Sequence, residues 1–114
     1  MESRLVSEYD LDRLKLNNAK ASKDPKSALM PVIKLHADCC LWLATHIKPD
    51  NDTLCGLQFI DGGFPEITTF SLSELEMAAK SPLSLVVEKD ETFTNQGKTI
   101  VDFAKDLQPP SKFT

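Results

Sequence analysis

Two apolar segments of similar length on either side of a short polar turn constrain the fold more than any other feature of this sequence. The segments are CCLWLATHI (39–47) and TLCGLQFI (53–60). Between them lies KPDND (48–52), in which proline fixes one backbone angle and Asp and Asn side chains bond back to the main chain. Residues 41–60 are therefore predicted to form an antiparallel hairpin.

Other strand-like segments lie on either side of this hairpin. PVIKLH (31–36) is predicted to be a strand that opens with a proline. EITTF (66–70) and LSLVVE (83–88) are also predicted to be strands. DGGFP (61–65) interrupts the pattern, and we interpret its glycine pair as a backbone reversal. A phosphate-binding loop would lead into a helix, whereas a proline and a strand follow here.

The clearest local signal marks the start of a helix. Ser71 and Glu74 have the spacing of a capping box, in which each side chain accepts a hydrogen bond from the other residue's main chain. Phe70 and Leu75 have the spacing of a hydrophobic staple. A helix is predicted over residues 72–79.

Two further helices are predicted nearer the ends of the chain. In KTIVDFAKDL (98–107), apolar residues recur at i, i+3, i+4 and i+7, which is typical of an amphipathic helix. SEYDLDRLKLNNA (7–19) is predicted to be a short helix capped by Ser7 or Asp10. Its apolar face is narrow, so we expect this helix to be peripheral.

Strands clustered ahead of helices predict an α+β fold. We expect a small, mainly antiparallel sheet of four to five strands, with two helices packed on one face and a short N-terminal helix. The 114 residues fit a single domain. We place that domain at 29–108, after an N-terminal helical arm and linker (1–28) and before a tail (109–114).

Charge is unevenly distributed along the chain. The net charge is −4, but residues 1–34 carry seven Lys/Arg against five Asp/Glu, and the remainder carries six against twelve. An acidic body argues against ordinary binding to a nucleic-acid backbone; it indicates either solubility or a surface that imitates nucleic acid. The basic arm is the alternative nucleic-acid site, with candidate residues Arg13, Lys15, Lys20, Lys23 and Lys26.

Cysteine and histidine residues do not indicate a reactive centre. Three cysteines do not make a disulfide framework, and the adjacent Cys39 and Cys40 would point to opposite faces of a strand. We interpret them as buried apolar residues and predict no catalytic residue, no metal and no cofactor. Neither a signal peptide nor an apolar segment long enough to span a bilayer is present in this sequence, which favours a cytoplasmic protein without membrane contact.

Acidic residues cluster at two points that would meet if their strands were neighbours. Asp61 and Glu66 flank the glycine turn, and a second group follows the last predicted strand. Such a rim could contact a basic patch of a protein partner, hold Mg²⁺ or Ca²⁺, or be a solvated loop edge. The candidate partner-binding residues are Asp61, Phe64, Glu66, Glu88, Asp90 and Glu91.

Taken in order, four segments resemble a bacterial family of unknown function, DUF2958. They are MPVIKLH, LWLATHIKPDNDTLCGL, GGFPEITTFSLSELE and PLSLVVEKDETF, which together cover roughly residues 30–93. The sequence departs from the family pattern at Asp38–Cys40 and at Gln58–Asp61, and Lys89 replaces an arginine. The positions that match the pattern are Lys34, Leu35, Trp42, Leu43, Pro49, Gly56, Leu57, Gly63, Pro65, Glu66, Ser71, Leu72, Glu74, Leu75, Glu88, Asp90 and Phe93.

The resemblance implies a setting rather than a reaction, because the family has no established activity. That setting is plasmids, phages and integrative elements. We therefore predict a non-enzymatic accessory protein of such an element that binds another protein. A sharper version of this prediction is an inhibitor of host restriction or CRISPR defence. The alternatives are a divalent-metal-dependent enzyme that uses the acidic rim, and a nucleic-acid-binding protein that uses the basic arm.

Overall fold

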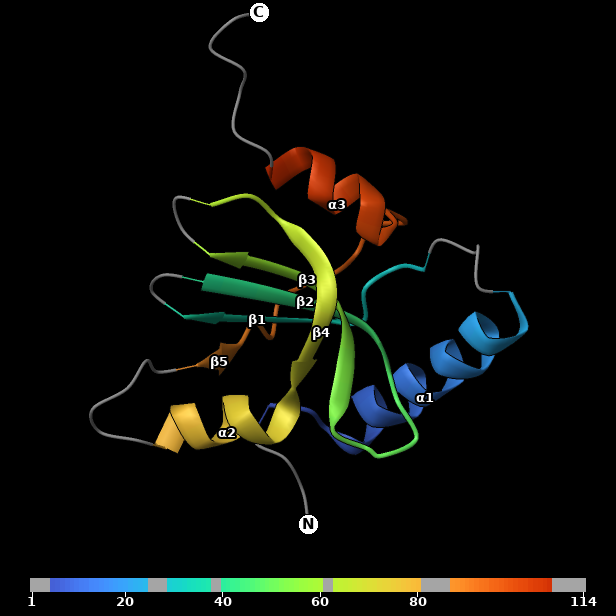
Figure 1. The fold of residues 1–114 in the computed structure, drawn as a ribbon, viewed down its shortest axis with the longest axis horizontal. Helices are drawn as coiled ribbons and strands as arrows, with labels where there is room; N and C mark the ends of the chain where they lie inside the picture. The colour runs from blue at the N-terminus through green and yellow to red at the C-terminus, as the bar shows by residue number, and fades with distance from the viewer. Residues whose placement is uncertain (1–4, 25–28, 38–39, 61–62, 81–86, 108–114) are drawn as a thin grey trace, which may run out of the picture.

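A five-stranded antiparallel sheet with three helices forms the framework of the protein (Figure 1). The computed structural model describes residues 5–24, 29–37, 40–60, 63–80 and 87–107. This confirms the predicted α+β fold. The elements are α1 (Glu8–Lys23), β1 (Ile33–Ala37), β2 (Cys40–Ile47), β3 (Thr53–Ile60), β4 (Glu66–Ser71), α2 (Leu72–Lys80), β5 (Glu88–Lys89) and α3 (Ile100–Leu107).

The strands lie in the order β4-β3-β2-β1-β5. The predicted hairpin is confirmed as β2 and β3, which pair antiparallel from Cys40–Ile60 to Ile47–Leu54. In the turn, the Asp50 carboxylate accepts hydrogen bonds from the main-chain N–H of Asp52 and from Thr53, as expected for a short acidic side chain at this position. Of the predicted strand at 83–88, Glu88 opens β5, while residues 83–86 lie outside the described part of the chain.

One irregularity interrupts the register of the hairpin. It falls between Ala44 and His46 of β2, beside the position where Ala44 faces Gly56 of β3. A Cβ atom added to Gly56 would lie 1.8 Å from the main-chain oxygen of Leu43. Glycine at this position therefore allows a close approach of two backbones, which is one of the reasons for glycine inside a strand.

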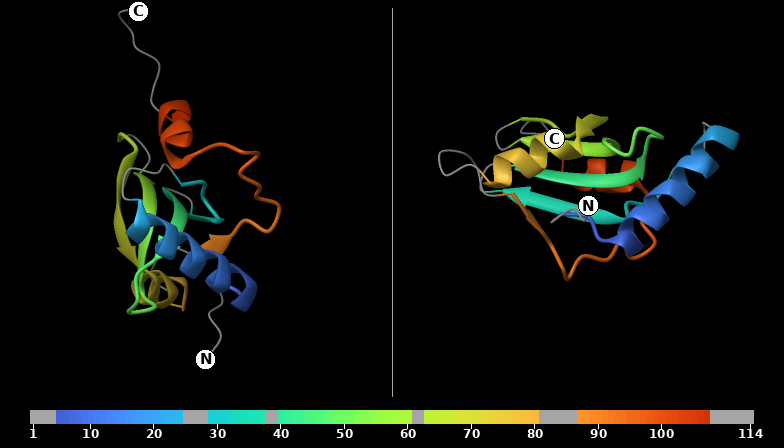
Figure 2. Two further views of the ribbon diagram at one scale, coloured as in Figure 1. Left: turned by 90° about the vertical axis from the view of Figure 1, so that its right-hand side faces the viewer. Right: turned by 90° about the horizontal axis from the view of Figure 1, so that it is seen from below.

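The sheet is covered on both faces, not on one face as expected from the sequence. Alternate residues of β2 point to opposite sides, so Trp42 packs with the first core and Leu43 with the second. This explains the continuous apolar run of that strand. The first core includes residues of α1 and α2, and the second includes α3 (Figures 1 and 2).

Helix α1 is a packed element and not the peripheral helix predicted from its narrow apolar face. Its capping box is complete, because Asp10 N–H donates to Ser7 Oγ and Ser7 N–H donates to the Asp10 carboxylate. It extends to Lys23, four residues beyond the predicted end. Leu14 is fully buried in the first core, together with Leu5 and Val6 from the segment before the helix.

The start of α2 is fixed by two segments of the chain. The predicted cap is observed in one of its two hydrogen bonds, in which Glu74 N–H donates to Ser71 Oγ at 3.2 Å. Asp52, from the β2–β3 turn, accepts two further hydrogen bonds from main-chain N–H groups at the start of the helix. Its carboxylate accepts from Ser73 N–H at 2.7 Å, and its main-chain oxygen accepts from Leu72 N–H at 2.9 Å. The hairpin turn therefore positions this helix.

In the described part of the chain, no helix combines the length and the apolar character needed to cross a bilayer.

Replacement of Leu14 by alanine tests whether α1 belongs to the core. We expect Leu14→Ala to lower the free energy of unfolding by about 2–4 kcal/mol, because a fully buried leucine leaves a cavity when it is truncated. Leu16→Ala, on the same helix at 64% exposure, is the matched control and should change stability by less than about 0.5 kcal/mol. Urea unfolding followed by circular dichroism measures both. Equal effects of the two substitutions would contradict the packing of α1.

Candidate functional site

The two halves of the predicted acidic rim lie at opposite edges of the sheet. Glu66 begins β4 at one edge, and Glu88 belongs to β5 at the other. Three strands separate them, which corresponds to about 19 Å at the usual spacing between strands. Asp61 lies outside the described residues. The condition for a shared rim, neighbouring strands, is therefore not met by the strands that carry Glu66 and Glu88.

Acidic residues around β5 are bonded to the protein itself. The carboxylate of Asp90 accepts hydrogen bonds from Thr92 N–H and Oγ1 and lies 3.8 Å from Lys34 Nζ. The hydrogen bonds from Thr92 are the main cause of the lowered pKa of Asp90. Glu91 lies 3.8 Å from Lys89. A very short strand flanked by charges is a common way to protect a sheet edge from pairing with another chain.

The edge at β4 is longer than the edge at β5 and carries fewer charges. Its six residues pair with β3 in continuous register, without a bulge. Glu66 is its only charged residue. Among the described residues, no strand pairs with its outer side. One row of its main-chain N–H and C=O groups is therefore directed away from the sheet, as at any edge strand.

Large apolar side chains surround this open edge. Phe64 is 73% exposed, Ile67 is 57% exposed and Ile60, at the end of β3, is 52% exposed. By the alternation of strand residues, Ile60 and Glu66 belong to one face of the sheet and Ile67 to the other, while Phe64 lies in the segment that leads into β4. We name this region the β4 edge surface, defined as Ile60, Phe64, Glu66 and Ile67.

Sequence reasoning identified two of these four residues, Phe64 and Glu66. Ile60 and Ile67 were missed because each occupies a strand position that is equally suited to a core residue. Their exposure depends on which strand lies at the edge, and this is a property of strand order. The alternating pattern of a single strand does not carry that information.

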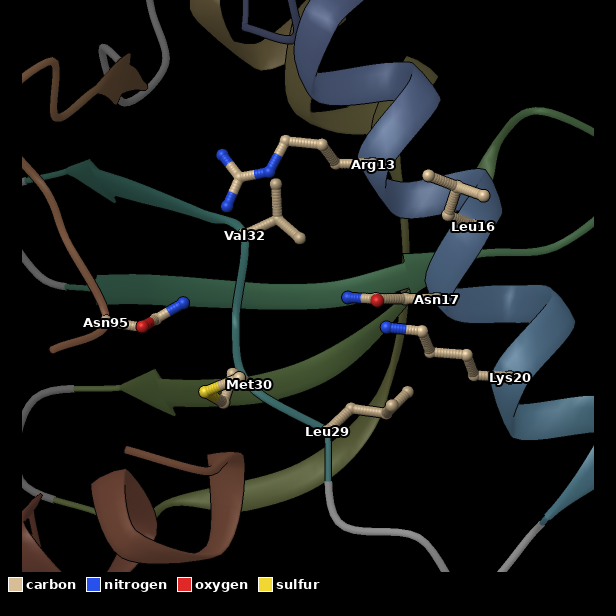
Figure 3. A pocket seen from close by; sticks show the side chains of 8 residues that line it. All are labelled: Arg13, Leu16, Asn17, Lys20, Leu29, Met30, Val32 and Asn95. Carbon is tan, nitrogen blue, oxygen red and sulfur yellow. The ribbon is translucent and has the colours of Figure 1, made fainter. Parts of the chain in front are cut away.

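Basic residues of α1 do not form a single stripe. Arg13 and Lys20 lie on the same side of the helix and line a cavity of about 440 Å³ between α1 and residues 29–32 (Figure 3). Lys15 is exposed and Lys23 is exposed near the end of the helix, and neither belongs to the cavity lining. Lys26 lies outside the described residues. The predicted arm is thus divided between a cavity and an open helix surface.

The cysteine and histidine residues of the hairpin do not form an activated pair. Cys55 faces His46 across the β2–β3 register. Burial raises the pKa of the Cys55 thiol, which disfavours the nucleophilic thiolate. Burial, followed by the nearby charge of Lys48, lowers the pKa of His46. Within the described ranges, no three His, Cys, Asp or Glu side chains gather as a metal site would require.

Comparison with known proteins gives one result that extends over nearly the whole chain. No curated protein and no solved structure matches the chain. Residues 5–108 match a family described as "Protein of unknown function (DUF2958)". The match begins ahead of α1 and ends after α3, so it includes the N-terminal helix as well as the sheet. The chain belongs to the DUF2958 family.

Proposed function

We propose that this chain is a non-enzymatic accessory protein that binds another protein through the β4 edge surface. One observation supports this proposal above the others: the sheet has one protected edge, at β5, and one open edge, at β4, with exposed apolar side chains around it. Open edge strands of this kind are templates for pairing with another chain.

The proposed contact is the addition of a strand. An extended segment of the partner pairs with β4, and the main-chain hydrogen bonds of the new ladder supply affinity. Side chains of the added strand alternate between the two faces, so that some lie on the face of Ile60 and Glu66 and others contact Ile67, while Phe64 lies beside the start of the new ladder. Glu66 is the only charged residue of β4, which favours a partner segment with Lys or Arg at the facing position.

The biological setting is the second part of this proposal. The sequence pattern that places the chain in its family supports an accessory role on a bacterial plasmid, phage or integrative element, in the cytoplasm of the host. The excess of acidic residues after residue 34 supports an inhibitor of a host defence protein that itself binds nucleic acid, as in restriction or CRISPR systems. The two alternatives gain less support, because the acidic rim is divided and the basic residues of α1 are dispersed.

Charge substitutions at the β4 edge surface test the proposal. Tagged protein is used to capture partners from a bacterial host lysate, and these are quantified by mass spectrometry. Phe64→Lys and Ile67→Lys should each reduce capture of the partner at least about tenfold, because a charge then replaces an apolar contact. Met77→Lys is the matched control, since Met77 is 71% exposed but lies on α2, and it should leave capture unchanged.

Hydrogen exchange of the recovered complex locates the contact. We expect new protection of main-chain N–H groups in residues 66–71, and a chelator should not dissociate the complex. Equal loss of capture in the Met77→Lys control, or protection confined to α1, would place the contact elsewhere. Dissociation by the chelator would favour a metal-dependent role.

A further inference from the structure

The cavity beside α1 is bounded by two consecutive segments of the chain and by one residue that is distant in sequence. One wall is α1, the floor is the chain that leads into β1, and Asn95 closes the side opposite the helix (Figure 3). Arg13, Asn17 and Lys20 point toward it from successive turns of the helix. Its volume of about 440 Å³ lies within the range of sites for small molecules.

Two amide side chains of the lining are held in place by hydrogen bonds to the main chain. Asn17 Nδ2 donates to the main-chain oxygen of Thr45 at 2.8 Å. Asn95 Nδ2 donates to the oxygen of Pro31 at 3.0 Å, and Asn95 Oδ1 accepts from Gly97 N–H at 2.9 Å. Each amide nitrogen keeps a second hydrogen for another acceptor. The cavity therefore has polar groups whose orientation is set before any ligand enters.

The charge of the cavity is positive. Arg13 and Lys20 are its only charged lining residues in the described part of the chain, and neither forms an ion pair there. The Arg13 guanidinium lies 5.4 Å from the centre of the Tyr9 ring, a contact that orients it and leaves its charge uncompensated. Two cations without a carboxylate at the mouth of a cavity indicate an anionic ligand.

The remaining lining is apolar, and part of it is exposed. Leu16 is 64% exposed and Met30 is 45% exposed, and both lie at the cavity with Leu29 and Val32. A purely inorganic anion would make no use of these side chains. A ligand that carries a flat or apolar body beside its anionic group would cover them.

We propose that this cavity binds a small organic phosphate of nucleotide size. The phosphate lies between Arg13, whose planar guanidinium matches two phosphate oxygens, and Lys20, which acts as a point charge. The base or another flat group lies against Leu29, Met30 and Val32, within reach of the second amide hydrogens of Asn17 and Asn95. A concave site favours a small ligand over a nucleic-acid strand, because the other exposed lysines of α1 lie outside it. The proposal is independent of partner binding at β4.

Titration of the isotopically labelled protein by nuclear magnetic resonance tests the proposal. The probes are the four ribonucleoside 5′-monophosphates, with adenosine and inorganic phosphate as the separate halves of one of them. At least one monophosphate should shift the side-chain amide signals of Asn17 and Asn95 and the main-chain signals of Met30 and Val32. It should bind at least about tenfold more tightly than either half alone, since both the charged and the apolar contacts are then made.

Charge-removing variants assign the site. Arg13→Gln and Lys20→Gln should each weaken binding at least about tenfold, because each removes a charge-assisted hydrogen bond to the phosphate. Lys15→Gln, on the same helix but outside the lining, is the matched control and should bind as the unmodified protein does. Circular dichroism of all three variants verifies that α1 is intact.

Three outcomes would overturn the proposal. The first is the absence of shifts at the cavity with all four monophosphates up to about 10 mM, a concentration that detects even weak binding. The second is an equal loss of affinity in Lys15→Gln, which would indicate general attraction between charges. The third is binding of a single-stranded oligonucleotide without binding of any monophosphate, which would assign the basic residues of α1 to nucleic acid.

Discussion

Replacement of Gly56 by alanine should destabilise the fold more than the same replacement at Gly63 or Gly97, the other glycines that the structure describes. The new Cβ atom would lie 1.8 Å from the oxygen of Leu43 and 2.9 Å from its carbonyl carbon. Both atoms belong to a backbone in the centre of the sheet, so neither can move without disrupting the β2–β3 ladder. We expect a loss of more than about 3 kcal/mol in the free energy of unfolding, or failure to fold.

Gly97→Ala is the matched control for this result. Gly97 has a φ of +78°, and a Cβ atom there would meet nothing within 4 Å. We expect Gly97→Ala to lower the free energy of unfolding by about 1–2 kcal/mol, because alanine is disfavoured only by the left-handed backbone conformation at this position. Urea unfolding measures the stability of both variants, and the near-ultraviolet circular dichroism of Trp42 shows whether the packing of the sheet is retained. A Gly56→Ala protein as stable as Gly97→Ala would contradict the close approach of β2 and β3.

Asp10→Ala is expected to have the second largest effect. Asp10 is 5% exposed, forms the capping box of α1 with Ser7, and binds Lys89 of β5. Its removal leaves the largely buried ammonium of Lys89 without this partner and the Ser7 N–H without its acceptor. Loss of one member of a buried ion pair destabilises proteins by about 3–5 kcal/mol. Urea unfolding at neutral pH measures this loss in the free energy of unfolding. Asp106→Ala, which breaks the exposed pair with Lys98, is the control and should cost much less.

The same carboxylate contributes to the pH dependence of stability. Burial alone would raise the pKa of Asp10, but hydrogen bonds from Lys89 and Ser7 outweigh burial and lower it below its ordinary value of 3.8. A group whose pKa is lowered on folding stabilises the protein above its unfolded pKa and loses that effect as pH falls through its folded pKa. The stability difference between the unmodified protein and Asp10→Asn should therefore be constant near neutrality and shrink below pH 3.8. A difference that stays constant down to about pH 2 would show that the Asp10 charge is not stabilising.

Local signals in the sequence predicted local structure well. The polar turn between two apolar segments predicted the β2–β3 hairpin, and the Ser71–Glu74 spacing predicted where α2 begins. Both depend on residues within a few positions of one another. The hydrogen bond from Ser73 N–H to the Asp52 carboxylate was not predictable, because it depends on how the hairpin turn packs against the start of the helix.

Features that depend on strand order could not be read from the sequence. A shared acidic rim required the strands at Glu66 and Glu88 to be neighbours, and no local pattern distinguishes neighbours from opposite edges. The importance of Gly56 depends on a register shift in the partner strand. The burial of α1 involves Asp10, which is polar, and Leu5 and Val6, which precede the helix. None of these three residues belongs to the apolar face of the helix, so the width of that face underestimated how much of α1 is buried.

The contact between Asp10 and Lys89 joins residues 79 positions apart. During synthesis, α1 leaves the ribosome long before β5, so it acquires this partner only when most of the chain has been made. Contacts of such long range are formed late and slowly, because a large loop must close first. The apolar face of α1 can pack on β2 before this stage, but the Asp10 carboxylate receives its cation only after β5 has been made.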